Sequence, residues 1–94
     1  MQSLAITGEL TIYTAATEKS KLQAFLASDD EVEVNLSQVN EMDTAGLQVL
    51  VLLKKEAARQ SKKIHYVMHS KAVIDILEMA NLTSSFGDQV VLTS

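Results

Sequence analysis

One junction near the middle of the chain limits the possible folds more than any other stretch. Residues 31–36 alternate strictly between polar and apolar side chains, which is typical of a β-strand with a single buried face. After a short polar segment, residues 45–60 form the most apolar part of the chain and carry basic residues toward their far end. The length of this segment favours a helix over a buried strand, and cations suit the C-terminal end of a helix. The junction therefore predicts a strand, a short loop and a helix in succession.

Two neighbouring side chains could begin this helix. Asp43 and Thr44 each carry an oxygen that can accept a hydrogen bond from an unpaired N–H group of the first helical turn. A hydroxyl at this place would also lie at the positive end of the helix dipole, where added negative charge is tolerated. Thr44 is therefore either an ordinary helix cap or a residue at which charge can be added, and local chemistry leaves both interpretations open.

The remaining patterns predict an α/β domain. Apolar residues in alternation predict strands, and apolar residues three or four positions apart predict helices. The expected strands are residues 4–7, 10–13, 32–36, 64–68 and 89–92. The expected helices are residues 15–27, 45–60 and 71–80.

Local signals support several of these boundaries. Gly8 and Glu9 are expected to form a bulge or turn between the first two strands. Thr14 and Ser70 are placed to cap the first and third helices. Residues 1–94 are too few for a second domain, and the one-sided strand suggests that helices lie on one face of the sheet. The side chains expected in the core are Val32, Val34, Leu36, Leu47, Leu50, Ile64, Ile74 and Leu77.

Composition excludes several classes of function. The chain has no cysteine, which rules out disulfides and thiolate chemistry and favours an intracellular location. Its net charge of −4 disfavours binding to nucleic acid and permits a basic protein partner. The N-terminus lacks the pattern of a secretory signal, and the longest apolar run, residues 49–53, is far short of the roughly 20 residues of a membrane span. We therefore expect neither secretion nor membrane insertion.

No catalytic or metal-binding set emerges from the motifs. His65 and His69 are four residues apart, but on a strand this spacing places them along one face and does not bring them together on a metal ion. The acidic residues are typical of a solvated surface, and no serine has a histidine placed by a recognisable motif. We expect no enzyme activity, no bound metal and no cofactor.

Three segments, taken in order, resemble the STAS domain family, which is named for sulphate transporters and anti-sigma factor antagonists. Residues 43–47, Asp-Thr-Ala-Gly-Leu, resemble the signature of the family after its central strand. Residues 8–12 resemble its second-strand motif, and residues 73–82 resemble its third helix and the turn after it. The resemblance implies a mixed sheet of four to five strands with helices mainly on one face.

The family resemblance also implies a function. In stand-alone bacterial members, the residue matching Thr44 is commonly a serine or threonine that a partner anti-sigma factor with serine/threonine kinase activity phosphorylates. The unphosphorylated form binds that partner and frees a sigma factor. The resemblance thus implies a cytoplasmic bacterial interaction module in transcription regulation, with Thr44 as its phosphorylation site. The expected partner-binding residues are Asn40, Glu41, Met42, Asp43, Thr44, Ala45 and Gly46, together with the exposed side of the helix that follows.

Other branches of the family leave alternatives open. One branch of small members is an accessory subunit of lipid ABC transporters and binds the transporter ATPase through this same corner. Another group is associated with chemotaxis. Many phosphorylated members carry serine where this chain has Thr44, and some branches keep a threonine there as a contact residue. The resemblance identifies neither the partner nor the oligomeric state.

Overall fold

The computed structural model describes residues 1–79. Strands and helices alternate along this range, as the α/β prediction requires. The elements are β1 (Gln2–Leu10), α1 (Ala15–Leu26), β2 (Glu31–Met42), α2 (Thr44–Arg59), β3 (Lys63–Val67) and α3 (Lys71–Met79). Helices α1 and α2 differ from the expected helices by one residue at most at each end, and α3 begins where the sequence predicts.

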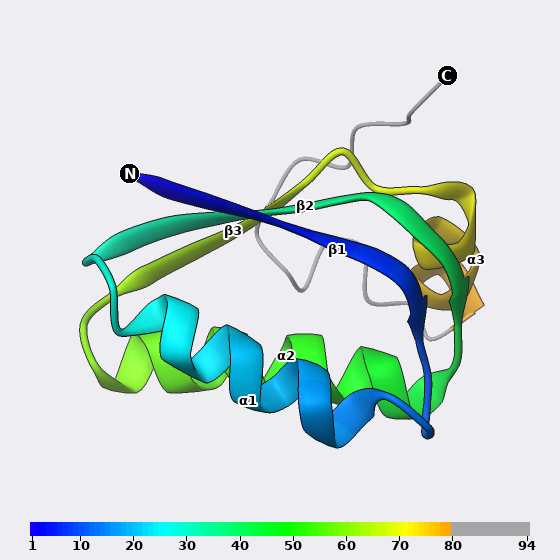
Figure 1. The fold of residues 1–94 in the computed structure, drawn as a ribbon, viewed down its shortest axis with the longest axis horizontal. Helices are drawn as coiled ribbons and strands as arrows, with labels where there is room; N and C mark the ends of the chain where they lie inside the picture. The colour runs from blue at the N-terminus through cyan, green and yellow to red at the C-terminus, as the bar shows by residue number, and fades with distance from the viewer. Residues whose placement is uncertain (80–94) are drawn as a thin grey trace.

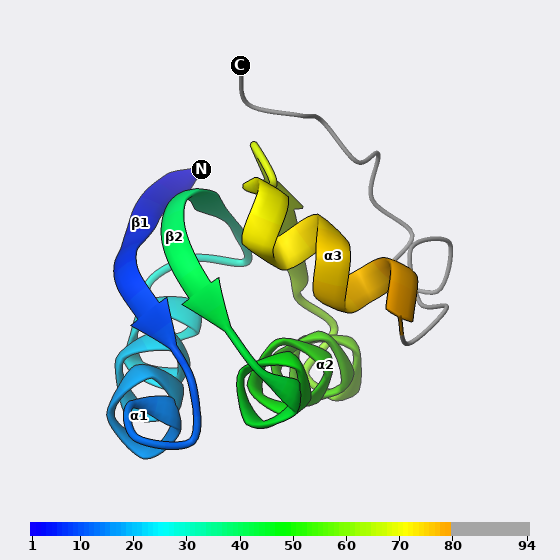
Figure 2. The same ribbon diagram turned by 90° about the vertical axis from the view of Figure 1, so that its right-hand side faces the viewer.

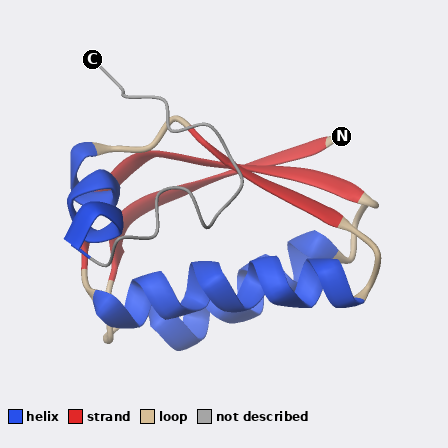
Figure 3. Ribbon diagram, turned by 180° about the vertical axis from the view of Figure 1, so that it is seen from behind, coloured by secondary structure: helices blue, strands red, loops and turns tan. Residues whose placement is uncertain are grey.

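The sheet has the strand order β1-β2-β3, and both pairings are parallel. Each helix between two strands is therefore a crossover connection, and successive right-handed crossovers in one direction place their helices on the same face. Figure 1 shows α1 and α2 side by side under one face of the sheet, and Figure 3 shows the same layers from behind. Helix α3 lies at one end of the sheet, where it packs against the curved end of β2 (Figure 2).

The strand predictions are confirmed only in part. The mixed sheet stays a prediction, because both strand pairings within residues 1–79 are parallel and the last predicted strand is not among them. The described range contains three strands rather than four or five, and the strand expected at residues 89–92 lies outside it, as does residue 80 of the third predicted helix. The two separate N-terminal strands are wrong, because β1 is one continuous strand.

The end of β1 explains why residues 10–13 are not a strand. Gly8 has a φ of +85° beside a shift in register, and the extra residue of this bulge belongs to β2, so β1 continues past Gly8. Immediately after Leu10, the Thr14 hydroxyl oxygen accepts from the N–H of Thr11 (3.0 Å) and lies 3.1 Å from the carbonyl oxygen of Glu9, to which it donates. Thr14 is therefore used to close a tight loop, residues 11–14, and its side chain does not cap α1.

Strand β2 is longer than predicted because its polar second half is held by β1. Ala5 pairs with Asn35, Gly8 with Val39, and Leu10 with Met42. Between the first and the last of these pairs, β2 therefore contains two more residues than β1. Such bulges bend a strand and change which residues face the core. Residues 37–42, which the sequence suggested were a polar loop, are consequently a strand with an irregular burial pattern.

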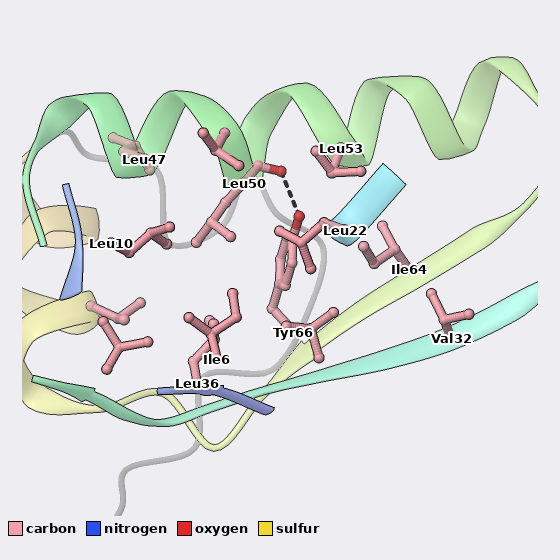
Figure 4. Close-up of a cluster of buried hydrophobic side chains, with 14 of the residues drawn as sticks. Ile6, Leu10, Leu22, Val32, Leu36, Leu47, Leu50, Leu53, Ile64 and Tyr66 are labelled. Carbon is pink, nitrogen blue, oxygen red and sulfur yellow. Dashed lines mark hydrogen bonds between the residues drawn. The ribbon is translucent and has the colours of Figure 1, made fainter. Parts of the chain in front are cut away.

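The core lies between the sheet and the pair α1 and α2, and buried side chains of α3 extend it. All eight side chains expected in the core are buried: Val32, Val34, Leu36, Leu47, Leu50, Ile64, Ile74 and Leu77. Figure 4 shows Leu47, Leu50 and Leu53 of α2 pointing toward side chains of the sheet. The single buried hydroxyl drawn there, that of Tyr66, donates to the carbonyl oxygen of Leu50 at 2.7 Å. Among residues 1–79, the other buried side chains of this core cluster are aliphatic, as the low aromatic content predicts.

Within residues 1–79, no helix is both long and apolar enough to cross a lipid bilayer.

Candidate functional site

Asp43 is the single residue between β2 and α2, and it caps α2. Its backbone is extended, and its Oδ1 accepts from the N–H groups of Ala45 (2.9 Å) and Gly46 (3.1 Å). These bonds satisfy two of the donors that a helix start leaves unpaired. Of the two capping alternatives, the structure therefore selects Asp43, and Thr44 is the first residue of the helix.

The second oxygen of the same carboxylate joins this helix start to the loop after β1. Oδ2 accepts from the N–H of Ile12 at 3.0 Å, and the N–H of Asp43 donates to the carbonyl oxygen of Leu10 at 3.4 Å. Asp43 and Ile12 are 31 residues apart in the sequence. We call the resulting surface the corner: it consists of the loop 11–14, the end of β2 from Asn40, and the first turn of α2.

The hydrogen bonds at the corner favour the ionised form of Asp43. The N–H of Ile12, followed by that of Gly46, lowers the pKa of the Asp43 carboxyl below its ordinary value of 3.8, because each donates to the carboxylate. The carboxylate therefore stabilises the fold at pH values above this ordinary value, and the contribution is lost as the pH falls through the lowered pKa of the folded state.

Because the contribution of the Asp43 carboxylate to stability depends on pH, the loss of stability in Asp43→Ala should depend on pH as well. The variant should have a lower urea midpoint than the wild type at neutral pH, because three N–H groups lose their acceptor. The difference should stay constant down to about pH 5 and shrink below about pH 4 as the wild-type carboxylate takes up a proton. Urea denaturation from pH 7 to pH 3 measures it, with Asp75→Ala, at an exposed position of α3, as the control. A difference between wild type and Asp43→Ala that does not change with pH would contradict the role given to the charge.

Gly46 brings α2 against the end of β1. A Cβ atom at this position would collide with the carbonyl oxygen of Leu10 and lie 2.9 Å from its Cγ atom. Glycine is thus required here for a close approach between helix and strand, and Gly46 itself is buried. Gly46 is one of the expected partner-binding residues, and the structure gives it a packing role between α2 and the end of β1.

The other predicted site residues differ in exposure. Asn40, Glu41 and Thr44 are exposed at the corner, whereas Met42 and Ala45 are partly buried, and Met42 packs against the core. Along α2, the exposed residues Gln48 and Leu52 follow Thr44 at intervals of four and lie on the same side of the helix. The structure therefore brings together an exposed surface around Thr44 that includes part of the predicted loop and the outer side of α2.

Sequence reasoning missed two residues of this surface. Ile12 is 69% exposed and Tyr13 is 90% exposed, although the sequence suggested that both belonged to a strand. The signal that could have found them is the threonine pair, Thr11 and Thr14, because threonine hydroxyls commonly close turns by bonding to nearby backbone. Their position was not predictable, since it depends on a hydrogen bond to Asp43.

The histidines lie away from the corner. His65 Nε2 is 2.8 Å from Glu31 Oε2, on the pair β2 and β3, and His69 is buried just before α3. Among residues 1–79, no group of three or more histidine, cysteine, aspartate or glutamate side chains could hold a metal ion.

Two solved structures have a similar fold. The anti-sigma factor antagonist SpoIIAA, in its unphosphorylated form, matches with a TM-score of 0.73 and 13% sequence identity, over 96% of this chain and 80% of that chain. A Thermotoga maritima protein described as a candidate anti-sigma factor antagonist matches with a TM-score of 0.76 and 20% identity, over the same shares of the two chains, 96% and 80%. These identities are low, so the likeness concerns the fold.

The sequence itself also matches a family model. The model described as "Mlab, STAS domain" covers residues 2–92, which is nearly the whole chain, and it includes the Asp43 junction and the loop after β1. The family resemblance of the sequence motifs is therefore confirmed. The chain belongs to the STAS domain family.

Proposed function

We propose that this protein is a non-enzymatic interaction module that binds a regulatory protein through the corner, and that phosphorylation of Thr44 controls the binding. One observation carries the proposal: Asp43 caps α2, which leaves Thr44 exposed at the first position of the helix. A hydroxyl at this place is accessible to a kinase and is not needed to hold the helix together. The similarity to SpoIIAA, whose structure is that of an unphosphorylated form, supports the same idea.

The fold should tolerate a phosphate on Thr44. After the Asp43 cap, the first turn of α2 contains no acidic side chain, and the added charge of about −1.5 to −2 would lie at the positive end of the helix, which offsets repulsion from the Asp43 carboxylate. The partner surface would respond differently, because it would be complementary to a neutral hydroxyl. An unpaired charge buried at an interface costs several kcal/mol, and about 1.4 kcal/mol corresponds to a tenfold change in affinity.

The proposed partner is an anti-sigma factor with serine/threonine kinase activity, and the proposed location is the bacterial cytoplasm. In this role the unphosphorylated protein binds the anti-sigma factor, and the phosphorylated protein releases it. An accessory role on a transporter ATPase, or an association with chemotaxis proteins, would use the same corner without phosphorylation.

Variants at Thr44 test the proposal. Wild type, Thr44→Ala and Thr44→Glu are used as baits in extracts of the native cell, and mass spectrometry identifies the protein that wild type retains. That protein is then purified and titrated against each variant, with circular dichroism as the folding control. We expect Thr44→Glu to bind at least about a hundredfold more weakly while remaining folded, and Thr44→Ala to bind like the wild type.

Two other results would change the conclusion. If Thr44→Glu binds as tightly as the wild type, the residue does not act as a switch. If Thr44→Ala is the variant that loses binding, the hydroxyl is a direct contact, and the accessory role on a transporter ATPase becomes the better description.

A further inference from the structure

We infer that Ile12 and Tyr13 are the apolar anchor of this docking surface, and that the partner protein receives them in an apolar pocket rimmed by lysine or arginine. The inference rests on the proposed function only in taking the corner as the docking surface. It adds residues outside the signature motif and states the chemistry of the partner.

The first argument is exposure. Tyr13 is 90% exposed and Ile12 is 69% exposed, and the two are adjacent on one short loop. Leu52, which lies on the same side of α2 as Thr44, is 40% exposed. Tyrosine is among the residues that most often carry the binding energy of protein interfaces, because its ring buries a large area in few conformations.

The second argument is that the loop is held in place. Thr11 is buried, its hydroxyl donates to the Glu9 carboxylate at 2.6 Å, and its N–H donates to the Thr14 hydroxyl oxygen at 3.0 Å. The N–H of Ile12 donates to Asp43 Oδ2, so both sides of the loop are attached to regular structure. An anchor that is ordered before binding loses little conformational entropy when it enters a pocket. The two exposed apolar side chains are thus presented by a fixed backbone.

The third argument is charge. Residues 1–18 and 37–53, the two stretches that meet at the corner, contain four acidic residues and no lysine or arginine: Glu9, Glu18, Glu41 and Asp43. On α1 the basic side chains begin at Lys19, directly after Glu18, and Lys21 lies 3.5 Å from Glu18. On α2 they begin only at Lys54. A partner whose pocket is rimmed by basic residues would be complementary in charge to this acidic surface, and the opposite charges would steer the two proteins together.

Asp43 joins the anchor to the switch. Its carboxylate binds the backbone of Ile12 on one side and the first turn of α2, which begins with Thr44, on the other. A partner seated on the anchor would therefore also cover Thr44. A phosphate added there would be buried under the apolar part of the same contact, away from the basic rim, so its charge would be unpaired.

A crosslinking experiment in the native cell tests this directly. The photoreactive amino acid p-benzoylphenylalanine replaces Tyr13, and in a control chain it replaces Met79, a 71% exposed side chain at the end of α3. We expect a crosslinked protein from position 13 only, identical to the protein that wild type retains as a bait, and a crosslinked peptide in which apolar residues are flanked by lysine or arginine. No crosslink from position 13, an acidic peptide, or a second copy of this chain as the product would overturn the inference.

Titration of the purified partner gives the second measurement. Ile12→Ser and Tyr13→Ser should each weaken binding by about tenfold or more, whereas Met79→Ser should not change it. Tyr13→Phe should keep most of the affinity, since the ring supplies the buried area. Because these side chains are exposed, the urea midpoints of the variants should remain those of the wild type. Raising the salt concentration should slow association, because the charges lie around the rim.

The outcomes separate the two proposals. If both serine variants bind like the wild type while Thr44→Glu loses binding, the anchor is wrong and the proposed switch stands. If the serine variants lose binding and Thr44→Glu does not, the anchor stands and the switch is wrong.

Discussion

Replacement of Leu50 by alanine should destabilise the protein by about 2–5 kcal/mol, the usual range for a fully buried leucine. Leu50 is 0% exposed and lies at the centre of the α2 side chains that face the sheet (Figure 4). The substitution leaves the Leu50 carbonyl oxygen in place to accept the hydrogen bond from the Tyr66 hydroxyl. The loss of folding stability therefore reports the contribution of the Leu50 side chain alone. A domain of this size has about 5–15 kcal/mol of total stability, and the variant should therefore lose a large part of it.

Leu52→Ala is the matched control for this prediction, because it removes the same atoms from the same helix at a position that is 40% exposed. Its effect on stability should be within about 0.5–1 kcal/mol. Urea denaturation of both variants, with the slope of the transition unchanged, gives the comparison. Equal losses at the two positions would mean that the face of α2 directed toward the core has been wrongly assigned.

Gly46→Ala should also destabilise the protein, by about 1–3 kcal/mol or more. The sign of this effect is informative, because alanine is the better helix former by about 1 kcal/mol and would stabilise an isolated helix. In the folded protein the new Cβ atom would collide with the carbonyl oxygen of Leu10, which is backbone and cannot turn away. The start of α2 would have to move from the end of β1, and the hydrogen bonds of Asp43 to Ile12 and Leu10 would be strained.

Thermal and urea denaturation of Gly46→Ala measure this cost, and Gln48→Ala, at an exposed position two residues on, serves as the control. The control should be close to neutral or slightly stabilising. A Gly46→Ala protein that is more stable than the wild type would show that the helix and the strand are not in close contact.

Local patterns were sufficient to predict the helices and most of the core. The apolar side chains of α2 recur at helical spacing, and burial of Leu47 and Leu50 follows from that spacing whatever the neighbouring elements are. The alternation of Val32, Val34 and Leu36 likewise predicted a strand with one buried face. In each case the information lies within a few consecutive residues, so it can be recognised without knowledge of the fold.

Predictions failed where a distant segment decided the structure. Residues 37–42 are polar enough to suggest a loop, but pairing with β1 some 30 residues earlier makes them a strand. Residues 10–13 alternate like a strand, but the hydroxyl of Thr14 turns the chain away after Leu10. Hydrogen-bond partners at such separations leave no periodic trace in the sequence.

The same distinction applies to the candidate site, where some features follow from the local sequence and others depend on contacts between distant segments. The sequence by itself determined the fold class, the helix that begins after Asp43, and Thr44 as a hydroxyl at the start of that helix, because capping chemistry and periodicity are local properties. Only the tertiary structure decided that Asp43 rather than Thr44 is the cap, that Gly46 packs against Leu10, and that Ile12 and Tyr13 lie exposed beside them. The physical reason is that the Asp43 carboxylate accepts hydrogen bonds both from the start of its own helix and from Ile12, which lies 31 residues before Asp43, and these segments become neighbours only when β1 and β2 pair.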